Sequence, residues 1–176
     1  MADSKEVVEA KEKTNDRAFY VERVKEIPTL IEWANDEIRD DKEVLMNATT
    51  ADGGVLEFAS DRLKDDKELV LNSVSREGWT CCYASERLKA DKDVLMAATA
   101  KDGQALYFAS EELRDDKDVV LSAVTNKPII LKYASYRLRG DKDVAIAAVS
   151  KGKGKAIGYV NEELRNSEEI QKLLEA

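Results

Sequence analysis

Apolar and polar positions along this chain follow a pattern that returns every 25 residues. Each unit opens on Asp-Lys, at residues 41, 66, 91, 116 and 141, and Asp16-Arg17 extends the series towards the N-terminus. A fixed period of this length is typical of a stacked repeat array. The pattern therefore predicts one elongated domain, in which each repeat buries its apolar face against its neighbours.

The first half of each unit has the pattern of a helix with a wide apolar face, as expected when a helix packs against its own repeat and both neighbours. In the fifth repeat this face consists of Val119, Val120, Leu121, Ala123 and Val124. The leading Asp suits a helix N-cap, and an acid two positions later favours the positive end of the helix dipole. Asp-Gly, Glu-Gly or a Pro predicts where the helix ends.

The second half of each unit predicts a second helix of about 10 residues. It carries an aromatic column that consists of Trp33, Phe58, Tyr83, Phe108, Tyr133 and Tyr159. A small residue follows each aromatic one, and an aliphatic residue comes four positions later, so we assign this stripe to the core. Serines recur after the small residue, at 60, 85, 110 and 135, and we expect their hydroxyls to bond a carbonyl of the preceding helical turn.

We therefore predict an all-α fold, an α-solenoid of six two-helix repeats with a half-repeat C-terminal cap. Residues 1–15 form an N-terminal cap segment, residues 16–166 form the solenoid, and residues 167–176 form a C-terminal capping helix. The sixth repeat is one residue longer than the others. The last helix fits either the closing layer of the stack or the first half of a further repeat.

Composition narrows the function classes. The 176 residues include no histidine, which removes Ser-His and Cys-His nucleophile pairs and His metal ligands. The two cysteines, Cys81 and Cys82, are adjacent, so they form neither a disulfide framework nor a zinc site. We expect no enzyme activity, no cofactor and no metal. No apolar run approaches the roughly 18 residues of a membrane helix, so we expect a cytoplasmic protein without a membrane partner.

Pairs of aspartates at 40–41, 65–66 and 115–116 raise the alternative of calcium ligation or paired-carboxylate chemistry. A lysine follows each pair directly, and no twelve-residue ligand loop with a central glycine is present. Helix capping explains these pairs better.

The combination of DKDVVLSAV at 116–124 and LKYASYRLR at 131–139 resembles an uncharacterised tandem repeat family of bacteria and large viruses, domain of unknown function 4116. The resemblance covers about residues 16–165. It implies tandem helical repeats and supplies no activity or catalytic residue. Repeat one departs from the pattern with Arg23, where later repeats have Ala or Ser, and with Ile27-Pro28, where three of them have an acid and Gly.

Departures from the repeat template indicate where a scaffold carries its specificity. Three positions of the second helix, spaced i, i+3 and i+7, share the face opposite the core stripe. Repeats one and two have polar or small residues there: Thr29, Glu32, Asp36, Gly54, Glu57 and Asp61. Repeats three to five instead carry Trp79, Cys82, Tyr107, Ile129 and Tyr136. Because Trp and Tyr are enriched at interface hot spots, we expect these five residues to bind a protein partner or a second copy. Template drift and coverage by the N-terminal segment are the alternatives.

Charge is distributed unevenly along the chain. Residues 125–155 carry eight basic residues against two acids, a net charge of +6, which leaves −14 for the rest of the −8 total. The inserted turn Lys151-Gly152-Lys153-Gly154-Lys155 provides lysines, glycines and backbone N–H groups that can cradle an anion, with a solvated turn as the alternative. We therefore expect a noncatalytic scaffold for protein–protein recognition. Binding of an anion or a nucleic-acid backbone at Lys151, Lys153 and Lys155 is the second hypothesis, although the overall negative charge opposes nonspecific nucleic-acid binding.

Overall fold

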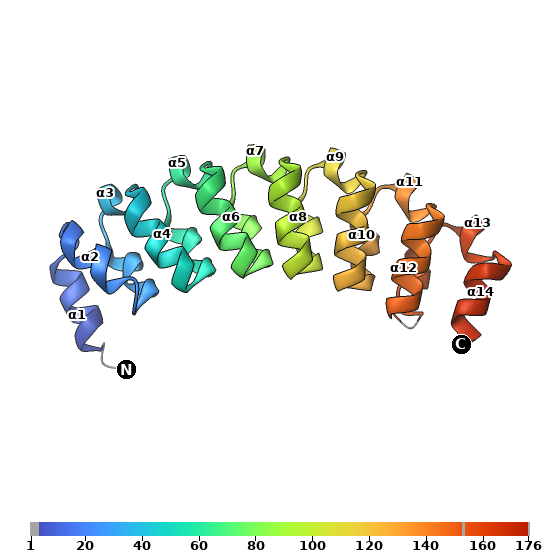
Figure 1. Cartoon of the computed structure of the whole chain (residues 1–176), viewed down its shortest axis with the longest axis horizontal. Helices are drawn as coiled ribbons and strands as arrows, with labels where there is room; N and C mark the ends of the chain where they lie inside the picture. The colour runs from blue at the N-terminus through green and yellow to red at the C-terminus, as the bar shows by residue number, and fades with distance from the viewer. Residues whose placement is uncertain (1–3, 153, 176) are drawn as a thin grey trace.

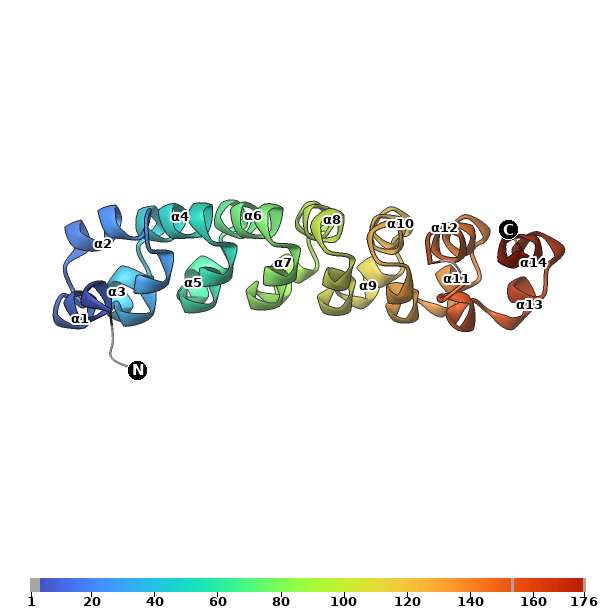
Figure 2. The ribbon, with the colours of Figure 1, turned by 90° about the horizontal axis from the view of Figure 1, so that it is seen from below.

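The structure is a computed structural model that describes residues 4–152 and 154–175. Helical repeats stack in sequence order along one axis and form a shallow arch, with the two termini at opposite ends (Figure 1). Seen at right angles to this view, the long α-helices form one layer and the remaining helical pieces form a second layer beneath it (Figure 2). No β-strand occurs among the described residues. The predicted all-α solenoid is confirmed.

Each repeat contains a long α-helix, a 3₁₀ helix and a one-turn α-helix, in that order. The long helices are α2 (Arg17–Arg23), α4 (Lys42–Ala51), α6 (Lys67–Arg76), α8 (Lys92–Lys101), α10 (Lys117–Asn126) and α12 (Lys142–Gly152). The 3₁₀ helices are η1 (Pro28–Trp33), η2 (Gly53–Phe58), η3 (Gly78–Tyr83), η4 (Gly103–Phe108), η5 (Pro128–Tyr133) and η6 (Ile157–Tyr159). The one-turn helices are α3 (Asp36–Arg39), α5 (Asp61–Lys64), α7 (Glu86–Lys89), α9 (Glu111–Arg114), α11 (Tyr136–Arg139) and α13 (Glu162–Arg165). Two further helices, α1 (Lys5–Glu12) and α14 (Glu168–Glu175), lie at the ends of the stack.

The long helices begin where the sequence predicts, and α4, α6, α8 and α10 also end there. In the first repeat the predicted end at Pro28 is wrong, because α2 already ends at Arg23. Asp91, for example, precedes α8 and accepts hydrogen bonds from the amides of Asp93 and Val94 at 3.0 and 3.2 Å. Asp116 caps α10 in the same way. Capping is thus the role of the second Asp in each pair, because its carboxylate satisfies amides that have no partner inside the helix.

The prediction of a second helix of about ten residues in each repeat is wrong. The segment forms a 3₁₀ helix and a one-turn α-helix, with a break between them. In repeat two, Ala59 follows η2 with an extended backbone, at φ −64° and ψ 151°. Ser60 then acts as the N-cap of α5 and accepts a hydrogen bond from the Leu63 amide at 3.2 Å. The serine therefore starts a new helix, and its expected bond to a carbonyl of a preceding turn does not form.

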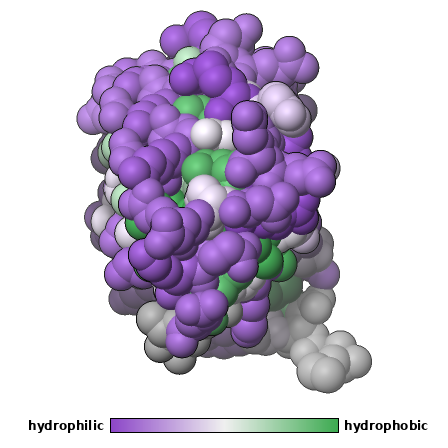
Figure 3. All heavy atoms as spheres, turned by 90° about the vertical axis from the view of Figure 1, so that its right-hand side faces the viewer, coloured by the Kyte–Doolittle hydropathy of each residue, from purple (hydrophilic) through white to green (hydrophobic). Residues whose placement is uncertain are grey.

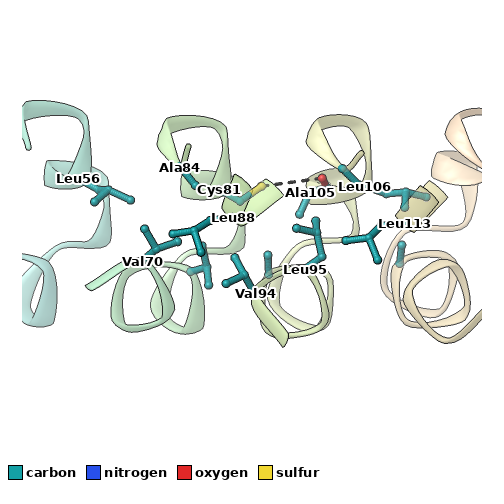
Figure 4. Close-up of a cluster of buried hydrophobic side chains, with 14 of the residues drawn as sticks. Leu56, Val70, Cys81, Ala84, Leu88, Val94, Leu95, Ala105, Leu106 and Leu113 are labelled. Atoms are coloured by element: carbon teal, nitrogen blue, oxygen red, sulfur yellow. Dashed lines mark hydrogen bonds between the residues drawn. The ribbon is translucent and has the colours of Figure 1, made fainter. Parts of the chain in front are cut away.

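The apolar core runs the length of the stack between the two layers. Figure 4 shows Leu88, Leu95 and Leu106, from consecutive elements, among the apolar side chains that fill the space between neighbouring repeats. All three are fully buried. In the 3₁₀ layer two consecutive positions are buried: one holds Leu56, Cys81, Leu106 and Leu131, and the residue before each of them is buried as well. The aromatic column lies two residues after Leu56, Cys81, Leu106 and Leu131. Its rings pack against the core but are only partly buried, so the assignment of this column to the interior is correct in part.

A ladder of lysines joins consecutive repeats along the long-helix layer. Lys67 contacts the cap residue of the next repeat, Asp91, at 2.8 Å, and also Asp93 at 2.7 Å. Lys92 bridges Asp116 and Asp118 in the same way, at 2.8 and 2.7 Å. The recurring Asp-Lys-acid motif therefore serves two functions, because one repeat's lysine binds the carboxylates that begin the next helix.

The C-terminal end of the stack is covered by α13 and α14. Ile170 of α14 is buried against the last repeat, and Leu174 is partly exposed. Viewed onto this end, the surface is mostly hydrophilic, with hydrophobic side chains showing between the polar ones (Figure 3). A polar outer face of this kind suits a terminal layer of a repeat array. No helix in the described ranges has the length and apolarity to cross a membrane.

Candidate protein-interaction surface

The five residues singled out by their departure from the repeat template lie on the 3₁₀ layer or beside it. Trp79, Tyr107 and Ile129 belong to η3, η4 and η5 and are 41%, 52% and 42% exposed. Tyr136 begins α11 and is 73% exposed. Cys82 of η3 is half-buried. Large apolar side chains are thus exposed in three consecutive repeats, at positions where the first two repeats have polar or small residues.

The geometry of the 3₁₀ helix decides which of these residues share an edge. With three residues per turn, side chains at i and i+3 lie one above the other, as Trp79 and Cys82 do in η3. Tyr136 lies beyond the break formed by Ala134 and Ser135, in a separate helix. The prediction that one continuous helix presents positions i, i+3 and i+7 on the same face is therefore wrong, because the helix is interrupted before i+7.

Edge-to-face ring contacts join the exposed aromatics to the partly buried column. Tyr107 packs on Tyr133 of the next repeat with ring centroids 4.8 Å apart, and on Phe108 at 5.0 Å. Trp79 packs on Tyr83 at 5.9 Å. Trp79 thus contacts a ring of its own repeat, whereas the Tyr107 contact spans two repeats. Sequence reasoning assigned Tyr83, Phe108 and Tyr133 to the core alone, and it missed their contribution to this surface.

A signal for that exposure exists in the residue types. Three of the six residues in the column are tyrosines, and a tyrosine hydroxyl needs water or a polar partner. Partial burial raises the pKa of Tyr83 above its usual value, and a hydrogen bond with Glu57 of the preceding repeat raises it further. Because the tyrosine hydroxyls need water or a polar partner, this column is expected at the boundary between the core and the solvent.

The cysteines of η3 add apolar contact and no reactivity. Burial raises the pKa of the Cys81 thiol to about 12, and its Sγ lies 3.8 Å from the Ala105 carbonyl oxygen. Burial also raises the pKa of Cys82. Both side chains therefore remain neutral thiols at pH 7, and a thiol is a weak nucleophile compared with a thiolate.

A row of acids flanks the aromatic residues. The position of Tyr136 is taken in the earlier repeats by the exposed carboxylates Asp36, Asp61, Glu86 and Glu111. Glu86 pairs with Lys89 at 2.9 Å, whereas Asp61 and Glu111 make no salt bridge with any described residue. The surface thus combines an apolar strip with unpaired negative charge beside it.

The first Asp of each pair holds neighbouring repeats together on the side of the one-turn helices. Asp65 accepts a hydrogen bond from the Ser85 hydroxyl, and its two carboxylate oxygens share the Arg87 Nε–H at N–O distances of 3.0 and 3.1 Å. Arg87 Nη2 also donates to the Asp65 backbone carbonyl at 2.6 Å. The Ser85 hydroxyl and the Arg87 guanidinium hold the pKa of Asp65 below its usual range. We call this arrangement the clasp. It recurs as Asp40 with Ser60 and Arg62, and as Asp115 with Ser135 and Arg137.

At two of the interfaces in the described part of the chain, both charged members of the clasp are replaced. The pair is Ala90 and Glu112 between repeats three and four, and Gly140 and Glu163 between repeats five and six. The Glu112 carboxylate forms hydrogen bonds with its own backbone amide and with the Ser110 side chain of the same repeat. Both hydrogen bonds lower the pKa of Glu112. The backbone hydrogen bond that joins consecutive repeats persists in both places, from Ser110 N to Lys89 O at 3.2 Å and from Asn161 N to Arg139 O at 3.0 Å.

The family model for "Domain of unknown function (DUF4116)" matches residues 16–64, 51–89, 66–114 and 116–165. The chain belongs to this family. The overlapping matches, each spanning up to two repeats, agree with the 25-residue units of the structure. No curated protein and no solved structure shows significant similarity to the chain.

The basic turn lies in the sixth DUF4116 repeat. Lys151 in the last turn of α12 and Lys155 are exposed, and Lys153 lies outside the described residues. The backbone amides of Gly154, Lys155 and Ile157 donate to carbonyls within the turn at 3.1, 3.0 and 3.0 Å. These three amides are used by the fold, so they are not free to bind an anion.

Proposed function

We propose that this DUF4116 protein is a noncatalytic scaffold that binds a protein partner along its 3₁₀ layer. The contact is the aromatic surface, made of Trp79, Cys82, Tyr107, Ile129 and Tyr136 with the column residues Tyr83, Phe108 and Tyr133 beneath. One observation carries the proposal: large apolar side chains are 41–73% exposed in three adjacent repeats. Exposed apolar patches rimmed by polar residues are characteristic of protein contacts, and Trp and Tyr are enriched at interface hot spots.

Charge indicates what kind of partner fits. The carboxylates of Asp61 and Glu111, which make no salt bridge with any described residue, are exposed at the positions that correspond to Tyr136 in repeats two and four. A segment with apolar side chains for the rings and basic side chains for these carboxylates would match both features. Apolar contact would supply most of the affinity, and the carboxylates would favour correct partners and orientation.

The titration behaviour supports a noncatalytic role. The pKa shifts of Asp65 and Asp115 follow from the Ser and Arg of the clasp. For Asp91, burial alone would raise the pKa, but hydrogen bonds from Lys67 and from backbone amides outweigh burial and lower it. Each of these carboxylates already has a structural task at a repeat interface, unlike an acid or base poised for catalysis.

Affinity capture from the native cell, followed by reconstitution with the purified captured protein, tests the proposal. We expect the triple variant Trp79→Ala, Tyr107→Ala, Tyr136→Ala to lose the partner while its far-UV circular dichroism is unchanged. The matched control is Val8→Ala, Leu174→Ala, which removes exposed apolar side chains at the two ends of the array. Equal binding by the triple variant would overturn the proposal. A partner that proves to be a second copy would appear as a dimer sensitive to the same three substitutions.

Salt separates this proposal from the anion hypothesis. Binding through aromatic rings persists at about 1 M salt, whereas binding of a phosphate polymer by lysines is lost because counterions compete. The probe for the second case is a single-stranded oligonucleotide, titrated at several salt concentrations against wild type and Lys151→Gln, Lys153→Gln, Lys155→Gln. A steep salt dependence that the triple Gln variant abolishes would favour the anion hypothesis.

A further inference from the structure

The interface between repeats five and six contains an open pocket of about 440 Å³. It is lined by Tyr136, Arg137, Gly140, Asn161, Glu163, Leu164 and Ser167. This is the interface where Gly140 and Glu163 replace the Asp and Arg of the clasp. The pocket therefore lies where three of the other interfaces are occupied by a guanidinium bound to a carboxylate.

The clasp shows what this space accommodates. Arg62, Arg87 and Arg137 each reach across one interface and make a bidentate contact of Nε and Nη2 with an Asp side chain and its carbonyl. Between repeats five and six, the chain supplies no such arginine. Asn161 Nδ2 donates to the Tyr136 carbonyl at 2.9 Å instead, and it would lie 2.7 Å from a β-carbon at Gly140.

The ionic groups that line the pocket are Arg137 and Glu163. The guanidinium of Arg137 is held by Asp115 of the preceding repeat, with Nε 3.0 Å from Oδ1. Glu163 is exposed and makes no salt bridge with any residue in the described ranges. The pocket therefore presents one carboxylate without a counterion.

Tyr136 adds a surface on which a planar cation can stack. Arg139 already lies over this ring, with Cζ 5.7 Å from its centroid, so the ring accepts a guanidinium on one side. At 73% exposure, most of the ring remains accessible to a second group. Guanidinium groups stack on aromatic faces and bind carboxylates through a planar fork, which ammonium groups do not do.

We propose that this pocket binds an arginine side chain of the partner, with the guanidinium between the Glu163 carboxylate and the Tyr136 ring. The inference rests on the proposed function, since Tyr136 belongs to both sites, and it makes the partner's chemistry specific. The partner segment carries an arginine at the end of the aromatic surface that lies towards repeat six.

The test titrates N-acetyl-arginine methylamide into the ¹⁵N-labelled full chain and follows amide shifts. We expect saturable shifts at Gly140, Asn161 and Leu164, with a dissociation constant on the order of millimolar. The matching citrulline compound, which has the same shape without the charge, should bind more weakly, as should the lysine compound. Glu163→Gln should reduce the arginine affinity about two- to fivefold, in line with an exposed ion pair.

A variant that fills the pocket gives the sharpest control. Gly140→Asp, Asn161→Ser, Glu163→Arg copies the clasp of Asp115, Ser135 and Arg137, and should abolish the shifts. Ala90→Asp, Glu112→Arg builds the same clasp between repeats three and four and should leave arginine binding unchanged. Equal binding of citrulline, or shifts that persist when the pocket is filled, would overturn the inference.

The two proposals can fail separately. Arginine binding in the pocket, combined with a partner that ignores Trp79→Ala and Tyr107→Ala, would remove the proposed function and leave the pocket. A partner that depends on Trp79 and Tyr107 but binds the filled-pocket variant as well as wild type would remove only the arginine site.

Discussion

At the turn after each long helix, packing against the next repeat restricts the residue type, in addition to the conformation of the turn. A β-carbon on Gly78 would lie 2.2 Å from the carbonyl oxygen of Ala98, and one on Gly103 would lie 2.3 Å from that of Ala123. Repeat five has Pro128 at this position, and there the neighbouring helix carries Gly152, whose β-carbon would lie 2.9 Å from that of Pro128. Close approach of two backbones therefore explains Gly78 and Gly103, and the ring of Pro128 explains Gly152.

Gly103→Ala should therefore destabilise the array by about 1–3 kcal/mol, because the added methyl group overpacks a backbone contact. Gly158→Ala is the matched control, since no heavy atom lies within 4 Å of its would-be β-carbon. That change should stay within about 1 kcal/mol of wild type. Urea unfolding followed by circular dichroism measures both, and equal midpoints for the two variants would contradict the close-approach explanation.

Among the elements, the broken second helix shows where helical periodicity misleads. The sequence Ala59-Ser60 is compatible with a continuous helix, and aromatic and aliphatic residues at helical spacing favour one. Ser60 instead caps α5 and donates its hydroxyl to Asp40, twenty residues earlier. The partner that favours the break lies in another repeat, so local periodicity does not reveal it.

Completing the clasp between repeats three and four tests its contribution. In Ala90→Asp, Glu112→Arg the new carboxylate can accept from Ser110 and from the new arginine, as Asp65 does from Ser85 and Arg87. We expect the melting temperature to rise by at most about 3 °C, because an exposed ion pair is worth little, and the gain should shrink in 1 M salt. Glu112→Arg alone is the control, since the arginine then has no Asp at position 90. A lower melting temperature for the double variant than for this control would show that the clasp does not stabilise the interface.

At the scale of the whole molecule, stability is distributed along the stack. Lys42, Lys67, Lys92 and Lys117 each bind the cap Asp of the next repeat at 2.8–2.9 Å. These pairs are partly exposed, so each contributes little, but the same contact recurs at successive interfaces. The free energy of unfolding of a repeat array is approximately a sum of such nearest-neighbour contributions. The groups that recur at successive interfaces therefore determine how stability depends on pH and salt.

The pH dependence follows from these recurring carboxylates. The pKa values of Asp40, Asp65 and Asp115 lie below their usual range because of a Ser hydroxyl and an Arg guanidinium. The unfolded chain, with ordinary Asp pKa values near 3.9, therefore binds protons first as the pH falls. The stabilisation is complete above about pH 5 and is lost below about pH 4, as the pH falls towards the folded-state values.

We expect the melting temperature to be nearly constant from pH 5 to 8, since the chain has no histidine, and to decrease below about pH 4. Asp65→Asn, Asp115→Asn should lower the melting temperature at pH 7, and the difference from wild type should narrow towards pH 3, because protonation of these aspartates in the unfolded chain removes the wild-type advantage. Calorimetry over this pH range measures the effect. A difference that stays the same at both pH values would mean that the aspartates act through shape and not through charge.

By itself, the sequence determined the 25-residue period, the starts of the long helices and the apolar face that each one buries. These features depend on rules that act within a few residues, namely caps such as Asp91 and the spacing of Val119, Val120 and Ala123. It also singled out Trp79, Tyr107, Ile129 and Tyr136 as departures from the template, and the structure leaves all four exposed. Only the tertiary structure decided that Ser60 breaks the second helix, that Tyr83 and Tyr133 are half-exposed, and that Gly140 and Glu163 leave a pocket. The physical reason is that each of these outcomes depends on side chains that stacking brings in from 20 to 25 residues away.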